Sequence, residues 1–137
     1  MTIQDRLDQA VQLLKNKLIA EAPFDTGNLA LNAIRLIQDN GAWHIVIGGE
    51  VAPYAPFTNE KWERGQNPNE GWIQRTIENA KPTLIKVLSG RITQEEYERE
   101  LNKQRLIIDA KKIRRSEELK LKEAKILERI NKIGGVR

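Results

Sequence analysis

Residues 34 to 48 read Ile-Arg-Leu-Ile-Gln-Asp-Asn-Gly-Ala-Trp-His-Ile-Val-Ile-Gly, and this stretch decides the fold. Asn40 and Gly41 stand between two apolar-rich runs, 34–38 and 43–48. Both central positions of a type I′ turn need a positive φ, which Asn and Gly tolerate, so the stretch predicts an antiparallel hairpin. Alternate residues of the second run share one face, which we expect to be the core layer. These residues are Trp43, Ile45 and Ile47.

Apolar residues before the hairpin recur at steps of three and four, the spacing of an amphipathic helix. They are Ile3, Leu7, Val11, Leu14 and Leu18. We predict a helix over residues 2–21, with Thr2 as its N-cap and Asp5 supporting that cap. Pro23 follows at once and is expected to end the helix.

A central helix is predicted after the hairpin, starting near Asn69 or Glu70 and running to about Leu88. Pro82 lies inside it and is a possible kink. The residues expected to be buried on this helix are Trp72, Ile73, Ile77, Leu84 and Leu88.

A third, much longer helix is predicted at the C-terminal side. Gly90 is a natural stop for the central helix, and Thr93 with Glu96 forms a capping box for the next one. Residues 93–132 contain neither Pro nor Gly, so they can form one rod of roughly 60 Å. Its apolar stripe is too irregular for a heptad coiled coil. We expect this arm to dock on a neighbouring molecule, and a chain ended before Ile92 to keep its fold.

Composition limits the classes to which the chain can belong. Its 137 residues are 39% hydrophobic and 31% charged, which suits one domain with a modest core and a large solvated surface. The sequence has no apolar run of bilayer length and no secretory signal pattern. It also has no cysteine, which excludes disulfides and thiolate metal sites. We therefore predict a protein that does not enter a membrane and is assembled in a cytoplasm.

Three motifs follow one another along the chain. They are Ala22-Pro23-Phe24-Asp25-Thr26-Gly27-Asn28-Leu29, then Tyr54-Ala55-Pro56-Phe57, then Asn67-Pro68-Asn69-Glu70-Gly71-Trp72-Ile73. Their order and spacing resemble the small neck and tail-completion proteins of tailed bacteriophages, over roughly residues 13–88. The chain departs from the usual family pattern after the second motif, where it has Asn59-Glu60-Lys61-Trp62 instead of a glutamate followed by Gly-Thr.

The resemblance implies a structural virion protein at the head-tail interface. Such a subunit would form a homo-oligomeric ring, hexameric or dodecameric, around the DNA channel. Its partners would be the portal or connector, the tail proteins and the passing DNA. A closed ring needs two different patches on each subunit, because its interfaces are head-to-tail.

The first motif has a structural interpretation in physical terms. Asp25 or Thr26 can cap a helical turn, Gly27 can take a conformation that other residues resist, and Leu29 can anchor the turn on the sheet. Asn28 completes this structural motif. An aspartic-protease Asp-Thr-Gly is the alternative, but no apolar strand leads into Asp25.

Other chemistry has little support in the sequence. His44 is the only histidine and stands in no motif. The acidic residues around the central loop resemble ordinary surface more than a two-metal site. They are Glu60, Glu63, Glu70 and Glu78. No glycine-rich phosphate loop is present. We therefore predict no catalytic residue, no metal site and no cofactor, and the chain is not expected to be an enzyme.

Two groups of residues are candidates for binding partners. Aromatic residues in and beside the loop after the hairpin form a candidate subunit interface. They are Tyr54, Phe57, Trp62 and Trp72. Residues 91–137 carry a net charge of +5 against −1 for residues 1–90, so the arm is a candidate for contact with DNA or an acidic partner. Its candidate cations are Lys111, Lys112, Arg114, Arg115, Lys120, Lys122 and Lys125.

Together these patterns predict an α+β fold. An N-terminal helix and a central helix pack on a small antiparallel sheet, and a long helical arm follows. Residues 1–90 are expected to form the neck-like domain and residues 91–137 the charged arm. A basic nucleic-acid-binding accessory protein is the alternative to the structural virion role, and a mixed-charge solvated helix is the simplest interpretation of the arm.

Overall fold

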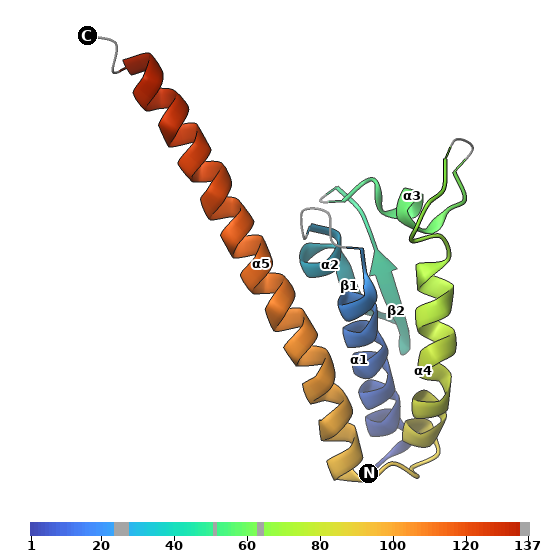
Figure 1. Ribbon diagram of the computed structural model, residues 1–137. Coiled ribbons are helices and arrows are strands. Elements are labelled where there is room, and N and C mark those ends of the chain that lie inside the picture. The colour runs from blue at the N-terminus through green and yellow to red at the C-terminus, as the bar shows by residue number, and fades with distance from the viewer. Residues whose placement is uncertain (24–27, 51, 63–64, 135–137) are drawn as a thin grey trace.

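The computed structural model describes residues 1–23, 28–50, 52–62 and 65–134. It confirms the α+β fold class: helices surround one two-stranded antiparallel sheet, and a long C-terminal helix projects from the body (Figure 1). The elements are α1 (Ile3–Glu21), α2 (Asn28–Asn32), β1 (Ile34–Asp39), β2 (Ala42–Ile47), α3 (Ala55–Asn59), α4 (Trp72–Leu88) and α5 (Gln94–Gly134).

Helix α1 begins at the predicted cap. The Thr2 hydroxyl accepts a hydrogen bond from the Asp5 amide at 3.1 Å, and the Asp5 carboxylate accepts one from the Thr2 amide at 3.0 Å. These two bonds complete the capping box and lower the pKa of Asp5. At the other end the Ala22 amide still donates to the Leu18 carbonyl, and Pro23 follows, so the predicted helix end is confirmed.

The hairpin has the predicted turn and register. Asn40 and Gly41 both have positive φ, 49° and 79°, and β1 pairs with β2 so that Ile34 lies opposite Ile47. The predicted core face of β2 is confirmed. Ile45 and Ile47 pack against buried residues, and the Trp43 indole donates to the Asp8 carboxylate of α1 at 3.0 Å.

Buried side chains form two clusters. The first, which we call the sheet core, joins α1, α2, the sheet, α3 and the first residue of α4. Its members are Leu18, Ala22, Leu29, Ala33, Ile34, Ala52, Ala55 and Trp72. Leu29 is 1% exposed and packs in this cluster, while the turn that it is predicted to anchor lies outside the described residues.

The second cluster, which we call the bundle core, joins α1, α4 and the first turns of α5. Its members are Ala10, Leu13, Val87, Tyr97 and Leu101. Val87 is 1% exposed, whereas Leu88, predicted as buried, is 48% exposed. That prediction was wrong because Val87, and not Leu88, packs with the residues of α1 and α5 in this cluster.

Helix α5 belongs partly to the body. Its start is capped by the Thr93 hydroxyl, which accepts from the Glu96 amide at 3.1 Å. Tyr97 and Leu101 are both 8% exposed, and the Tyr97 hydroxyl donates to the Gln9 carbonyl of α1. The packing of α5 on α1 therefore argues against the expectation that a chain ended before Ile92 keeps its fold.

The remainder of α5 projects from the body. The helix has 41 residues, so it extends about 61 Å at 1.5 Å per residue. In Figure 1 it starts beside α1, diverges from it, and ends well clear of the body. Among the described residues, no helix combines the length and hydropathy that a bilayer span would need.

Candidate interaction surfaces

Asn67 holds the loop between α3 and α4 together. Its side chain is buried and donates to the carbonyls of Thr58 and Glu60, at 2.9 and 2.7 Å. Its carbonyl oxygen accepts from the Asn69 amide at 2.9 Å. The Asn-Pro-Asn sequence is therefore a clamp that ties the loop to the end of α3.

Helix α4 receives its cap from a distant residue. Gly71 stands at the N-cap with a φ of 72° and has no side chain to offer. The Asn59 side chain accepts from the Ile73 amide at 3.0 Å, and the Asn59 carbonyl accepts from the Gly71 amide at 2.9 Å. The predicted start near residue 69 is early by two or three residues, because residues 67–71 form the turn that this cap closes.

The structure separates the four aromatic interface candidates. Trp72 is 3% exposed, and its indole donates to the Thr58 hydroxyl at 2.9 Å, so it belongs to the sheet core and not to a free surface. Tyr54 is half-buried against that core. Trp62 is 37% exposed and is the candidate that remains at the surface. The side chain of Phe57 and residues Asp25, Thr26 and Gly27 lie outside the described part, as does the side chain of Asn28.

We expect Asn67→Ala to lower the free energy of unfolding by about 2–3 kcal/mol, because it leaves two carbonyls and one amide without their partner. Gln66→Ala is the matched control, since Gln66 is adjacent and exposed, and it should change stability by less than about 0.5 kcal/mol. Urea unfolding of both variants measures the difference. Equal effects would show that the clamp does not hold the loop.

One row of residues on α5 faces the body. Steps of four and three alternate along this row, which we call the body-facing stripe: Tyr97, Leu101, Gln104, Ile108, Lys111, Arg115, Glu118, Lys122, Lys125, Arg129 and Lys132. The first three positions of the stripe are buried and the next four are half-buried. Between Lys111 and Leu119, the residues that do not belong to the stripe are exposed. From Leu119 to Lys132 every residue is exposed. The stripe thus changes from apolar to basic where the helix leaves the body.

Lys111 stands at this transition and is used within the fold. Its ammonium group donates to the carbonyls of Ile19 and Ala22, at 2.8 and 2.7 Å, and so caps the C-terminal end of α1. Burial lowers the pKa of Lys111 to about 8; Glu21 opposes this shift and Arg114 adds to it. The structure therefore takes Lys111 out of the set of cations offered to a partner.

The lowered pKa of Lys111 predicts a pH dependence of stability. The folded pKa, about 8, lies below the model value of 10.5, so the folded state releases this proton first as the pH rises. The contribution of Lys111 to stability is fully present above pH 10.5 and is lost as the pH falls through 8. We expect the wild type to gain stability between pH 7 and about 9.5 relative to Lys111→Met, measured by urea unfolding. Lys112→Met, a change at an exposed lysine, should follow the wild type; a parallel response of all three proteins would contradict the assignment.

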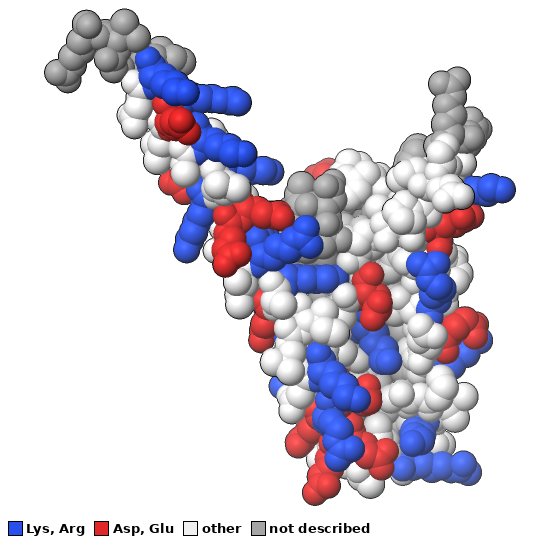
Figure 2. Space-filling view, in the orientation of Figure 1, with Lys and Arg blue, Asp and Glu red and all other residues white. Residues whose placement is uncertain are grey.

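The charge of the projecting half is concentrated on the stripe. Residues 112–134 carry 8 Lys plus Arg and 4 Asp plus Glu, a net of +4. On the stripe, from Arg115 to Lys132, five cations stand with the single acid Glu118, a net of +4, and Glu118 pairs with Arg114 at 3.2 Å. The residues of 112–134 that do not belong to the stripe include three cations and three acids, so their net charge is zero. Figure 2 shows several Lys and Arg side chains extending from the arm into the open space beside the body.

The structure divides the predicted cation set between the stripe and other faces of the arm. Lys112, Arg114 and Lys120 lie off the stripe, while Lys122 and Lys125 lie on it together with Arg115. The stripe also carries Arg129 and Lys132, which were not in the predicted set. Both residues can be located by counting alternate steps of four and three residues along the sequence from Tyr97, which is buried.

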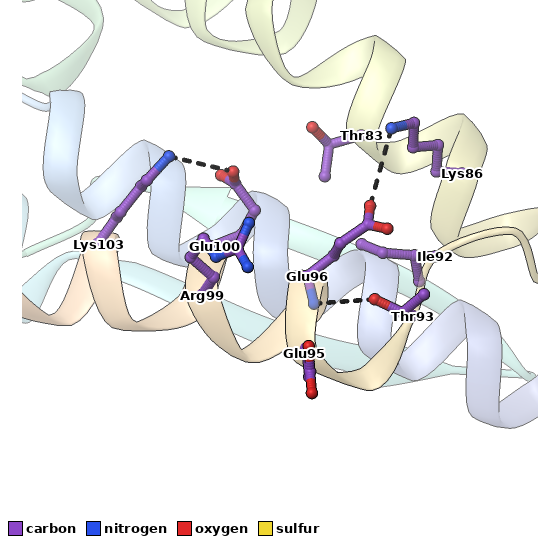
Figure 3. Close-up of a pocket in the computed structure, with 9 residues that line it drawn as sticks. All are labelled: Thr83, Lys86, Ile92, Thr93, Glu95, Glu96, Arg99, Glu100 and Lys103. Carbon is purple, nitrogen blue, oxygen red and sulfur yellow. Dashed lines mark hydrogen bonds and ion pairs between the residues drawn. The ribbon is translucent and has the colours of Figure 1, made fainter.

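A hollow of about 500 Å³ lies between the end of α4 and the start of α5 (Figure 3). Two ion pairs occur among its lining residues, Lys86 with Glu96 at 3.8 Å and Lys103 with Glu100 at 3.5 Å. Thr93, also in its lining, caps α5. The Lys86–Glu96 pair joins the two helices, whereas the other two contacts lie at the start of α5 or within it.

Side chains that could bind a metal ion are not brought together in the described part of the chain. No cluster of three or more His, Cys, Asp or Glu side chains there could hold a metal ion. His44 is exposed on β2, opposite Ile37.

No family model, no curated protein and no solved structure matches the chain. The three sequence motifs and the geometry of α5 are therefore the features that bear on the function of this chain.

Proposed function

We propose that the protein is a structural subunit of a tailed-bacteriophage virion, which forms a ring at the head-tail interface and joins the connector to the tail. The observation that carries the proposal is the projecting half of α5, whose apolar residues its own body does not cover. Leu119, Ile126 and Ile130, which we call the arm patch, are each more than 50% exposed. The order of the three sequence motifs supports the same role.

A second, different apolar set lies at the opposite end of the molecule. Ile3, Ile85 and Leu88, which we call the foot patch, are 83%, 62% and 48% exposed. They stand at the start of α1 and the end of α4, the end of the bundle that Figure 1 marks with the N-terminus. A ring needs two unlike patches, one to present and one to receive.

The occupant of the arm patch in this proposal is a second copy of the chain. Residues 1–111 carry a net charge of −1 and residues 112–134 carry +4. Contact between an arm and a neighbouring body therefore avoids the repulsion between like charges that contact between two arms would bring. This favours head-to-tail association over pairing of arms.

The test is assembly of an arm-patch variant. We expect Leu119→Ser with Ile126→Ser to reduce the protein to monomers without changing its melting temperature, because both side chains are exposed. Leu106→Ser with Leu121→Ser is the matched control, since these exposed leucines lie on other faces of α5, and it should assemble normally. Assembly of both variants would contradict the assigned interface.

A further inference from the structure

We infer that the basic part of the body-facing stripe, from Arg115 to Lys132, is a binding site for the phosphate backbone of double-stranded nucleic acid. The inference stands on the geometry of α5 and holds whether or not the chain forms a ring. It concerns the row of cations, which runs beside the arm patch on the helix.

The stripe has the periodicity of a phosphate-binding surface. Arg115, Lys122 and Arg129 recur at seven-residue steps, about 10.5 Å along a helix, and the whole set spans about 26 Å. A duplex carries one negative charge per about 1.7 Å of its axis, so a row of cations of this length lies in a strong negative potential beside it. An α-helix also fits the width of the major groove, about 12 Å.

The four cations of the stripe beyond Glu118 are exposed and can reach a partner. Lys122, Lys125 and Arg129 are exposed and make no ion pair among the described residues. Lys132 has an exposed pair with Glu128 at 3.7 Å, a contact of little strength in water. The stripe therefore presents a nearly unbroken row of positive charge.

Two observations favour nucleic acid over an acidic protein or a second copy. Residues 1–111 have a net charge of only −1, so another copy offers little negative charge to this row. Leu119, Ile126 and Ile130 lie beside the cations and not among them. A helix bound in the groove of an acidic protein would instead centre its apolar side chains and flank them with charge.

The experiment measures binding of the full chain to a fluorescein-labelled duplex of about 24 base pairs by anisotropy, between 50 and 200 mM NaCl. Release of four counterions, by Lys122, Lys125, Arg129 and Lys132, predicts a slope of log affinity against log salt of about −3.6, and a loss of affinity of about 150-fold across this range. Lys122→Gln with Lys125→Gln and Arg129→Gln should reduce the slope to about −1.

The control removes the same number of charges from other faces of the arm. Lys112→Gln with Arg114→Gln and Lys120→Gln should keep the slope close to that of the wild type. Circular dichroism of each variant checks that α5 stays helical. Equal losses in the two triple variants would overturn the inference, as would the absence of salt-dependent binding. Binding of poly-glutamate as tight as that of the duplex would also overturn it and would assign the stripe to an acidic protein.

Discussion

A chain that ends before Ile92 is expected to lose cooperative unfolding and to expose its apolar interior. The deletion removes Tyr97 and Leu101, which cover Leu13 and Val87 in the bundle core. Each large buried side chain contributes about 2–5 kcal/mol, and the whole stability of a small domain is about 5–15 kcal/mol. The deletion therefore removes a large part of the total.

A chain that ends at Ser116 is the matched truncation. It keeps Lys111 and its bonds to the end of α1, and apart from the half-buried Glu118 it removes only exposed side chains from the described part of the arm. Its free energy of unfolding should lie within about 1 kcal/mol of the full chain. Thermal melts and binding of a hydrophobic dye compare the two truncations. A sharp transition in the shorter chain would show that the first turns of α5 are not part of the body.

Replacement of Trp72 by Ala is expected to lower the free energy of unfolding by about 3–5 kcal/mol. Trp72 is 3% exposed, packs in the sheet core and donates its indole N–H to Thr58. The substitution leaves a cavity where α4 joins the sheet core, and it removes the bond that ties the first residue of α4 to α3. Urea unfolding followed by circular dichroism measures the loss.

Trp62→Ala is the control for this change. Trp62 is 37% exposed in the same loop region, so its replacement should cost less than about 1 kcal/mol. A small effect at Trp62 beside a large loss at Trp72 would separate a surface tryptophan from a core tryptophan. A stability loss at Trp62 as large as that at Trp72 would contradict this division.

Local rules were sufficient for much of the fold. The hairpin was predictable because Asn40 and Gly41 are two of the few residues that tolerate its turn, and α1 because Thr2 and Asp5 form a self-contained cap. The long helix followed from the absence of Pro and Gly over residues 93–132. Each of these signals lies within a few residues of the structure that it determines.

The positions that were not predicted depend on partners far away in the sequence. Val87 and Leu88 are adjacent and equally apolar, and the packing of α1 and α5 decides which is buried. The burial of Trp72 was predicted, but its hydrogen-bond partner Thr58, 14 residues before it, was not. Lys111 looks like any other arm cation until the end of α1, about 90 residues earlier, provides the carbonyls that it caps.

The central proposal is that this chain assembles into closed rings, and the mass and shape of the purified protein test it most directly. Light scattering at moderate salt, without nucleic acid, should give about 94 kDa for six copies or about 188 kDa for twelve copies of the 15.7 kDa chain, and negative-stain images should show rings. A protein that remains a monomer at micromolar concentration, with no rings in the images, would contradict the proposal.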